Sequence, residues 1–326
     1  MSLVRIGVIG CADIARRSMV PAILNLKDQY ILSGVSSRTK EKAEEFASLF
    51  DTVPYTGYES LLNEAEIDAV YIPLPNSMHA EWIEKALTNN IHVLVEKSMA
   101  CSYTEVKRLN KIASDKKLVL MENFQFRFHK QLPVINKMVK EGKIGELRCV
   151  RSSFGFPPFP DDNNIRYQKK LGGGALLDAG AYPIKIVQIY LGQDIEVSSA
   201  NLWYDKEKGI DIWGGAYLNQ KKSSLFAEIA FGFDNFYQCN LELWGSEGKI
   251  IAERIFTAPP DKSLEIIIES SKSNEVYHVT PCNHFENMLL YFCNLVDTKE
   301  DISAEYKQNI NQSRLIFETM NIACNK

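Results

Sequence analysis

VRIGVIGCADIA, at residues 4–15, is the stretch that decides the fold, because a short β-branched strand runs directly into a glycine turn and the start of a helix. This order is typical of the first βα unit of a dinucleotide-binding sheet, where a G-x-G-x-x-A sequence holds a pyrophosphate on backbone N–H groups. Gly10 supplies the tight turn and Ala15 lets the helix approach the sheet, while Ala12 stands where a second glycine is usual. The position of this turn at the first junction of an alternating domain favours a dinucleotide site over a plain βα turn.

Around this turn, short apolar runs alternate with helical patterns from residue 3 to about residue 122. The predicted strands are Val4–Ile9, Ile31–Ser36, Ala69–Ile72, His92–Glu96 and Leu118–Met121. The predicted helices are Asp13–Leu24, Lys40–Phe50, Ser77–Asn89 and Tyr103–Lys116, with Ser102 as the N-cap of the last one. Such alternation predicts a Rossmann domain with a doubly wound parallel sheet in residues 1–122.

Residues 123–326 have a different pattern, which predicts a second domain. Leu225–Gly232 and Cys239–Trp244 alternate apolar and polar residues as antiparallel strands do, and Gly245–Gly248 is typical of a hairpin turn. Helices are expected near residues 133–140, 175–190, 285–295 and 304–323. The predicted fold class is α/β, with the Rossmann domain followed by an α+β domain that has a large open, mainly antiparallel sheet.

The end of the second strand bears on the choice of cofactor. A free ribose 2′-hydroxyl usually meets a carboxylate there, whereas a 2′-phosphate meets a cation and hydroxyls. Residues 36–40 read SSRTK and include no carboxylate. Since Arg38 can bind a phosphate bidentately and Ser37 can donate a short hydrogen bond, NADP(H) is favoured over NAD(H).

Composition excludes several classes of protein. The net charge is −4 and like charges form no block, which argues against nucleic acid as a partner. Apolar runs such as Ala69–Leu74 are too short to span a membrane, and the first residues lack a secretory leader pattern, so we expect a cytoplasmic protein. The 7 cysteines form no C-x-x-C pair and the 5 histidines are scattered, which predicts free thiols and no metal site.

Three further segments resemble the glucose-fructose oxidoreductase and inositol dehydrogenase family (Gfo/Idh/MocA). They are PLPNSMH at residues 73–79, IHVLVEKS at residues 91–98 and GGGALLDAGAYP at residues 172–183. The family's usual E-K-P occurs here as Glu96-Lys97-Ser98, so the lysine is kept and the proline is not. The resemblance extends over nearly the whole chain and implies a Rossmann domain joined to an open antiparallel sheet domain.

The resemblance implies three catalytic residues: Lys97, Asp178 and Tyr182. Hydride transfer to or from a secondary alcohol needs a proton donor or acceptor at the oxygen and a cation that stabilises alkoxide charge. Lys97 follows a parallel strand, and Asp178 and Tyr182 are four residues apart on one predicted helix face. Tyr182 replaces the histidine of inositol dehydrogenases, which resembles the branch with glucose-fructose oxidoreductase, dihydrodiol dehydrogenase and sugar-nucleotide ketoreductases. Lys97 and Tyr182 would act as a pair, and the sequence leaves open which one passes the proton.

NFQFRFH at residues 123–129 alternates, so its polar side chains are expected on one face of a strand and its phenylalanines on the other. The segment resembles one that borders the active site of ketoreductases for nucleotide-linked deoxysugars. Residues expected to bind the cofactor are Gly10, Cys11, Ala12, Asp13, Ile14, Ser37, Arg38, Pro75, Asn76, His79, Glu96, Asn123 and Arg166. Residues expected to bind the substrate are Lys97, Gln125, Arg127, Asp178 and Tyr182.

These features predict an NADP(H)-dependent oxidoreductase that acts on a secondary alcohol or ketone carbon of a sugar, with a nucleotide-linked 3-keto deoxysugar as the specific expectation. One alternative is a dehydrogenase of free pyranoses or cyclic trans-dihydrodiols. Another is a regulatory protein that senses NAD(P) without turnover, which the retention of Lys97 and Tyr182 argues against. The open sheet predicts a homodimer or homotetramer.

Overall fold

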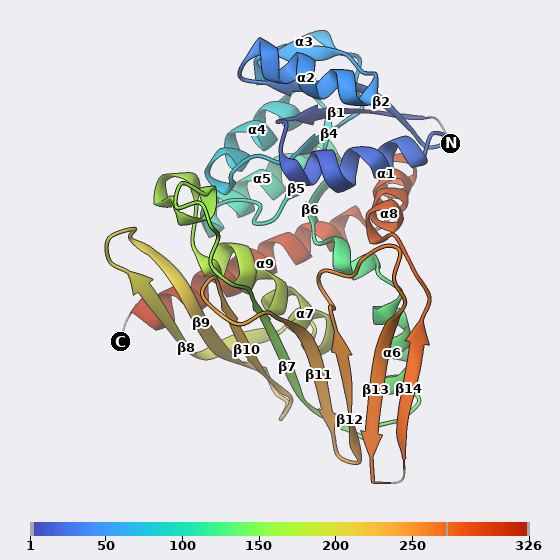
Figure 1. Cartoon of the computed structure of the whole chain (residues 1–326), viewed down its shortest axis with the longest axis vertical. Coiled ribbons are helices and arrows are strands. Elements are labelled where there is room, and N and C mark those ends of the chain that lie inside the picture. The colour runs from blue at the N-terminus through green and yellow to red at the C-terminus, as the bar shows by residue number, and fades with distance from the viewer. Residues whose placement is uncertain (1–2, 272, 325–326) are drawn as a thin grey trace. The chain divides into compact units, whose positions relative to one another are not determined.

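The computed structural model describes residues 3–271 and 273–324. By internal contacts the chain divides into two compact units, one formed by Met1–Asn123 with Phe285–Ile310 and the other by Phe124–His284 with Asn311–Lys326. Each unit is built on its own sheet (Figure 1). The boundary predicted between residues 122 and 123 stays a prediction for domains that fold independently.

The first unit has a six-stranded parallel sheet in the order β3-β2-β1-β4-β5-β6. Its strands are β1 (Val4–Ile9), β2 (Tyr30–Ser37), β3 (Pro54–Thr56), β4 (Ala69–Ile72), β5 (His92–Glu96) and β6 (Leu120–Asn123). The strand order reverses at β1, which lies between β2 and β4, and ligands of such sheets bind outside the carboxyl ends of the strands at this switch point.

The helices of the first unit include a π-helical turn η1 (Ala15–Met19), α1 (Val20–Asn25), α2 (Lys40–Phe50), α3 (Tyr58–Glu64), α4 (Asn76–Thr88), α5 (Tyr103–Lys116) and most of α8 (His284–Thr298). The predicted N-cap of α5 is confirmed, because the Ser102 hydroxyl accepts a hydrogen bond from the backbone N–H of Glu105 at 3.5 Å. The central strand β4 is fully buried, and so are the first four residues of β5, as expected for a sheet that is covered on both faces.

The second unit has an eight-stranded sheet in the order β14-β13-β12-β11-β7-β10-β9-β8. Its strands are β7 (Leu147–Gly155), β8 (Ile195–Asp205), β9 (Ile210–Gln220), β10 (Phe226–Gly232), β11 (Gln238–Gly245), β12 (Gly248–Glu253), β13 (Leu264–Ser270) and β14 (Asn274–Val279). Neighbouring strands are antiparallel except for β7 and β10, which run parallel. The predicted fold class is therefore confirmed.

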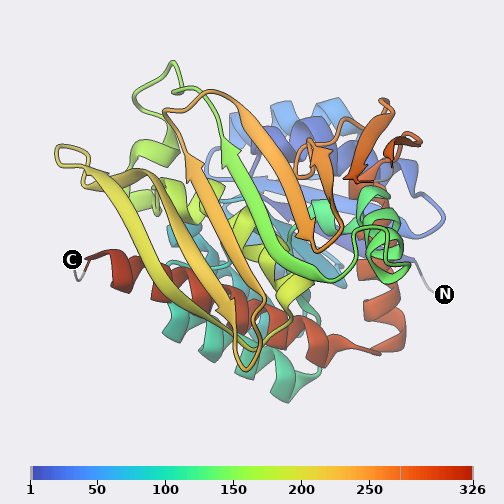
Figure 2. The same ribbon diagram turned by 90° about the horizontal axis from the view of Figure 1, so that it is seen from below.

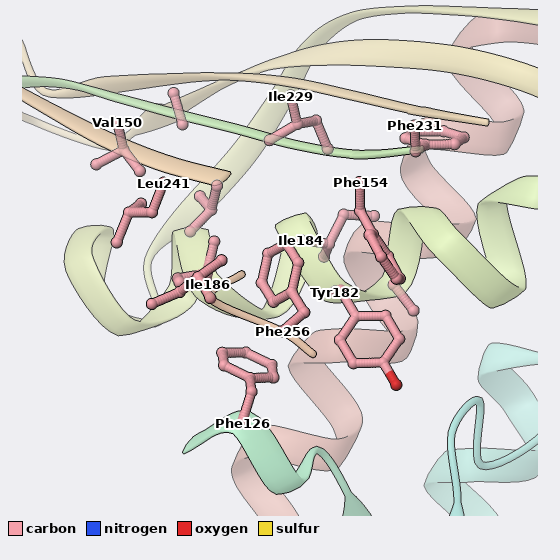
Figure 3. Packing of buried hydrophobic residues seen from close by; sticks show 14 of the residues in the cluster. Phe126, Val150, Phe154, Tyr182, Ile184, Ile186, Ile229, Phe231, Leu241 and Phe256 are labelled. Atoms are coloured by element: carbon pink, nitrogen blue, oxygen red, sulfur yellow. The ribbon is translucent and has the colours of Figure 1, made fainter. Parts of the chain in front are cut away.

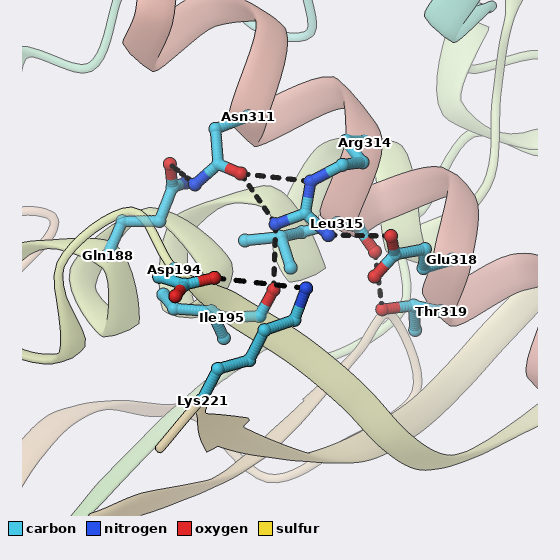
Figure 4. A network of polar contacts seen from close by, with 9 residues as sticks. All are labelled: Gln188, Asp194, Ile195, Lys221, Asn311, Arg314, Leu315, Glu318 and Thr319. Carbon is cyan, nitrogen blue, oxygen red and sulfur yellow. Dashed lines mark hydrogen bonds and ion pairs between the residues drawn. The ribbon is translucent and has the colours of Figure 1, made fainter. Parts of the chain in front are cut away.

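One face of this sheet packs on helix α7 (Ala181–Leu191), and Figure 2 looks onto the other face. The last part of α9 (Ile302–Cys324) is tied to the same unit by a polar network (Figure 4). Arg314 donates to the backbone oxygen of Ile195 at 2.8 Å, and Asn311 donates to the Gln188 side chain of α7 at 3.0 Å. These bonds fix the C-terminal helix against the helix that carries Tyr182.

The structure corrects the predicted strand at residues 123–129. Strand β6 ends at Asn123, and Gln125–Phe128 form a 3₁₀ turn. A 3₁₀ turn has three residues per turn, so alternate residues do not share a face. Gln125 is accordingly buried beside the phenylalanines and not on a separate polar surface.

Within residues 3–271 and 273–324, every helix is too short or too polar to cross a bilayer.

Candidate active site

The glycine turn after β1 has the geometry that a bound pyrophosphate requires. Gly10 has a φ of +108°, and a Cβ at this position would lie 2.7 Å from the Leu74 side chain. Its N–H donates to the backbone oxygen of Ser36 at 2.9 Å, which fixes the turn against β2. Only glycine combines this φ with such a close approach, and a helix start after such a turn is where dinucleotide-binding sheets hold a pyrophosphate on backbone N–H groups.

The residues that follow Gly10 line the start of the first helix. Cys11, Ala12 and Ile14 are half-buried and Asp13 is exposed. The Asp13 carboxylate pairs with Arg16 at 3.1 Å and with Arg17 at 2.5 Å, which lowers its pKa, so its backbone and not its side chain is suited to bind a phosphate.

The end of β2 carries the residues predicted to recognise the 2′-phosphate. Ser37 is buried at the last position of the strand, and Arg38 is exposed beside it. Burial raises the pKa of Tyr58, and the charge of the neighbouring Arg38 guanidinium opposes that rise. Arg38 therefore lies at the strand end with its charge open to solvent.

Lys97 directly follows β5, where the predicted catalytic residue should lie. Its peptide bond to Ser98 is cis. The imidazole of His79 links this loop to the loop before α4, with Nδ1 2.8 Å from the Ser98 oxygen and Nε2 2.7 Å from the Leu74 oxygen. Burial lowers the pKa of His79 to about 4, so the ring is neutral near pH 7 and donates to one of the two carbonyls.

Two carboxylates, one in β5 and one in β6, support the loop of Lys97. Glu96 accepts hydrogen bonds from the Tyr71 hydroxyl and the Asn123 amide, both at 2.6 Å. Glu122, buried in β6, accepts the backbone N–H of Met99 at 2.8 Å. Because these bonds come from β4, β5 and β6, they fix the loop relative to the carboxyl edge of the sheet.

A nicotinamide dinucleotide fits the residues present at this edge. Asn123 is 1 % exposed, and its Oδ1 is a buried acceptor with no hydrogen-bond partner in residues 3–271 and 273–324. A buried acceptor without a donor is costly, and a ligand amide or hydroxyl would satisfy it. Pro75 and Asn76, at the start of α4, are half-buried at the same edge. No group of three metal-ligating side chains was found within the described residues.

Tyr182 lies in an aromatic cluster of the second unit (Figure 3). Its ring centroid is 5.1 to 5.9 Å from those of Phe124, Phe126, Phe154 and Phe256. Figure 3 shows the phenolic oxygen pointing away from the other labelled side chains. The cluster thus fixes the ring by packing and leaves the hydroxyl at its margin.

Asp178 belongs to a π-helical turn, η5 (Leu176–Gly180), that precedes α7. Its carboxylate accepts a hydrogen bond from Arg166 Nε at 2.6 Å, and the guanidinium of Arg166 lies 4.9 Å from the Phe159 ring. Arg166, predicted as a cofactor ligand, is therefore paired with a predicted catalytic residue. A π turn spaces residues differently from an α-helix, so the predicted common face of Asp178 and Tyr182 does not follow from their spacing.

The glycine turn before η5 is held by Asp211 of β9, a residue that sequence reasoning missed. The Asp211 carboxylate accepts the backbone N–H of Leu176 at 2.5 Å. A Cβ on Gly174, whose φ is +120°, would lie 2.4 Å from Asp211 Oδ1. Burial raises the pKa of Asp211 to about 6. A buried acid within an apolar strand is the signal that could have identified it.

The remaining predicted pocket residues lie in the 3₁₀ turn. Gln125 is buried and donates to the backbone oxygen of Phe256 at 3.4 Å. The Arg127 guanidinium lies 5.2 Å from the Phe128 ring and is partly exposed. Arg127 is thus the more accessible of the two to a substrate.

A parallel sheet with a glycine turn at its switch point and a lysine at a strand end, followed by an open antiparallel sheet, defines a dinucleotide-binding protein of two units. Two family sequence profiles agree with this class. The profile described as "Oxidoreductase family, NAD-binding Rossmann fold" matches residues 4–124, and the "GFO/IDH/MocA C-terminal domain" profile matches residues 134–251. The chain belongs to the GFO/IDH/MocA oxidoreductase family, so the predicted family is confirmed.

Several known proteins are similar to this chain in sequence or in structure. The chain is 42% identical over 266 residues, 82% of this chain and 79% of the relative, to a dTDP-3,4-didehydro-2,6-dideoxy-alpha-D-glucose 3-reductase of Saccharopolyspora spinosa. The crystal structure of a 3-ketoreductase from Actinomadura kijaniata in complex with NADP and TDP-benzene superimposes with a TM-score of 0.94 at 35% identity over 98% of both chains. A trans-1,2-dihydrobenzene-1,2-diol dehydrogenase of Xenopus laevis is 30% identical over 83% of this chain and 79% of its own length.

Proposed function

We propose that this protein is an NADPH-dependent reductase of the C3 keto group of a nucleotide-linked deoxysugar. The observation that carries the proposal is the 42% identity to a dTDP-sugar 3-reductase along 82% of the chain. The chain also retains the catalytic groups that such a reaction needs, a lysine at the end of β5 and a phenol on α7. A regulatory protein without turnover would not need both groups.

The cofactor site that we propose follows the carboxyl edge of the parallel sheet. Backbone N–H groups of residues 11–14 bind the pyrophosphate, and Ser37 and Arg38 bind the 2′-phosphate. Pro75, Asn76 and Asn123 border the nicotinamide half, where the buried Asn123 oxygen needs a donor. His79 and Glu96 support these loops from beneath through the contacts described above. When bound, NADPH supplies the hydride.

Lys97 and Tyr182 have separate roles at the substrate oxygen, since one stabilises charge and the other donates a proton. The Lys97 ammonium stabilises the alkoxide that develops during reduction, and the Tyr182 hydroxyl donates the proton. Asp178 and Arg166, paired at 2.6 Å, orient the substrate hydroxyls near that oxygen. Gln125 and Arg127 complete the proposed substrate contacts.

The test is NADPH oxidation with a dTDP-linked 3-keto deoxysugar, run in parallel with NADP⁺ reduction by xylose and by a trans-dihydrodiol. Turnover of the keto sugar at least about a hundredfold above the other two supports the proposal. Turnover of the dihydrodiol alone supports the dehydrogenase function of the Xenopus relative instead. Tyr182→Phe should lose about a hundredfold in kcat. Tyr190→Phe is the matched control, because the buried Tyr190 hydroxyl lies on the same helix and has no partner within residues 3–271 and 273–324.

We also propose that the protein is a cytoplasmic homodimer that pairs through the outer face of the eight-stranded sheet. Trp203 and Trp244 are 45% and 48% exposed on that face, and Trp203 stacks on Trp213 at 4.1 Å. Arg151 lies between two carboxylates of the neighbouring strands, so both signs of charge are present for a self-complementary contact. Sedimentation velocity should give twice the chain mass, and Trp203→Glu should shift the protein toward the monomer. A wild-type monomer contradicts this proposal.

A further inference from the structure

Two hydrogen bonds from neighbouring strands meet on the residue that precedes Lys97. The side chains of Tyr71 in β4 and Asn123 in β6 both donate to the same oxygen of Glu96, the last residue of β5, at 2.6 Å each. Tyr71 is completely buried in a strand whose other residues are aliphatic. A buried phenol needs a partner, and here the partner is the residue next to the proposed catalytic lysine.

The Glu96 carboxylate is coupled to Lys97 in two ways. It directly precedes Lys97 in the chain, and its negative charge attracts the Lys97 ammonium. Burial raises the pKa of Glu96, and the Tyr71 hydroxyl is the foremost of the groups that oppose this rise. The Tyr71 hydroxyl and the Asn123 amide both donate to Glu96 Oε1, and two donors on one oxygen favour the ionised carboxylate, which accepts hydrogen bonds only.

We propose that Tyr71 is a positioning residue for Lys97 and acts through Glu96. The Tyr71 hydroxyl orients the Glu96 carboxylate and favours its ionised form, and that carboxylate, next to Lys97 in the chain, attracts the Lys97 ammonium at the carboxyl edge of the sheet. This role rests on the proposed function of Lys97.

The charged and titratable groups around Glu96 come from each element packed against it. Lys97 belongs to its own loop, Tyr71 to β4 and Glu122 to β6, while His79 of α4 lies against the same loop. His79 is neutral above about pH 4 because burial lowers its pKa to about 4, so it adds no charge near neutral pH. Removal of the Tyr71 hydroxyl should therefore raise the pKa of Glu96.

Tyr71→Phe removes only the hydroxyl. Its first readout is independent of turnover: the ¹³C shift of the Glu96 side-chain carboxyl is followed against pH in protein labelled at glutamate, with Glu96→Gln to assign the signal. We expect the Glu96 midpoint to rise by about one pH unit in Tyr71→Phe. The matched control is Tyr30→Phe, because the buried Tyr30 hydroxyl donates at 2.6 Å to the Leu289 oxygen in the same unit, far along the chain from Lys97.

The second readout is the pH profile of ketone reduction. In Tyr71→Phe the acid limb of kcat should move up by about one pH unit, so that kcat falls about tenfold on the acid limb of the wild-type profile and recovers at higher pH. The KM for NADPH should change less than about twofold, and Tyr30→Phe should keep the wild-type profile.

The outcomes separate this inference from the proposed function. A wild-type protein that reduces none of the keto sugars overturns the proposed function. An unchanged Glu96 midpoint overturns the positioning role whatever the activity. A shifted midpoint with an unshifted acid limb also overturns it, because Glu96 would then titrate without any effect on Lys97. An equal loss of kcat at all pH values in both tyrosine variants would show a general loss of packing and not positioning.

Discussion

Substitution of Gly174 by alanine tests how the turn before helix α7 is held. Gly174 has a φ of +120°, and the Cβ of an alanine would lie 2.4 Å from Asp211 Oδ1. Asp211 cannot move away freely, because its other oxygen accepts the Leu176 N–H at 2.5 Å. The positive φ costs about 1–2 kcal/mol for a residue with a Cβ, and loss of the buried hydrogen bond costs about 1–3 kcal/mol more. Gly174→Ala should therefore lower the free energy of unfolding by about 3 kcal/mol.

Gly192→Ala is the matched control. Gly192 also has a positive φ, +78°, but a Cβ there would meet no atom of the described residues within 4 Å. Only the conformational cost remains, about 1–2 kcal/mol. The assay is urea unfolding followed by tryptophan fluorescence, in which three of the four tryptophans, Trp203, Trp213 and Trp244, report on the second unit and Trp82 reports on the first.

A double substitution isolates the contact with Asp211. In an Asp211→Ala background the clash is absent, so Gly174→Ala and Gly192→Ala should cost the same free energy of unfolding. The reasoning is refuted if Gly174→Ala costs no more than Gly192→Ala in the wild-type background.

The other predictions concern cofactor choice, packing and acid stability. Arg38→Ala should weaken NADPH binding at least about tenfold and leave NADH binding nearly unchanged, measured by parallel fluorescence titrations; equal loss for both would contradict the 2′-phosphate assignment. Phe256→Ala should lower the free energy of unfolding by about 3–5 kcal/mol, because Phe256 is fully buried among Phe126, Phe154 and Tyr182; a loss below about 1 kcal/mol in urea melts would contradict this packing. Stability should fall as pH decreases from about 6.5 toward 4, since burial lowers the pKa of four histidines below their unfolded value and so favours their neutral forms. They are His79, His92 and His129, with a pKa of about 4, and His284, with a pKa of about 3. Asp211, with its pKa raised to about 6, and Glu96, whose pKa burial also raises, act in the opposite direction, but they are two groups against four histidines, so urea midpoints should be lower near pH 5 than near pH 7.

The first unit was predictable because its signals are local. A β-branched strand, Gly10 and a following helix fix the geometry of the dinucleotide turn within twelve residues, and β1, β4 and β5 have the predicted bounds. The short strand β3 and the helix α3 were missed. Three residues such as Pro54–Thr56 are too few to show a period.

The strand predicted at residues 123–129 was wrong because a period of two in the sequence is not sufficient for a strand. Phe126, in a 3₁₀ turn, and Phe124, just before it, both pack on Tyr182 in the aromatic core. Tertiary packing decided the local structure there.

The residues that hold the candidate site in place were not predicted from the sequence, and the reason is different. Tyr71, Glu122 and Asp211 lie in buried strands, where a sequence reading assigns every position to the core. Their partners are backbone or side-chain groups that lie at least 23 residues away, so only the fold brings them together. A polar residue in an otherwise apolar strand is nevertheless a signal, because burial requires that it be hydrogen-bonded.

The most direct test of the central claim is to follow the label into product from NADPH that carries two deuterium atoms at C4, with a dTDP-linked 3-keto deoxysugar as substrate, in the wild-type protein and in Lys97→Met. The account predicts a product with one deuterium at C3 from the wild-type protein and at least about a hundredfold slower formation by Lys97→Met. Product without deuterium, or equal rates of product formation by the two proteins, would contradict it.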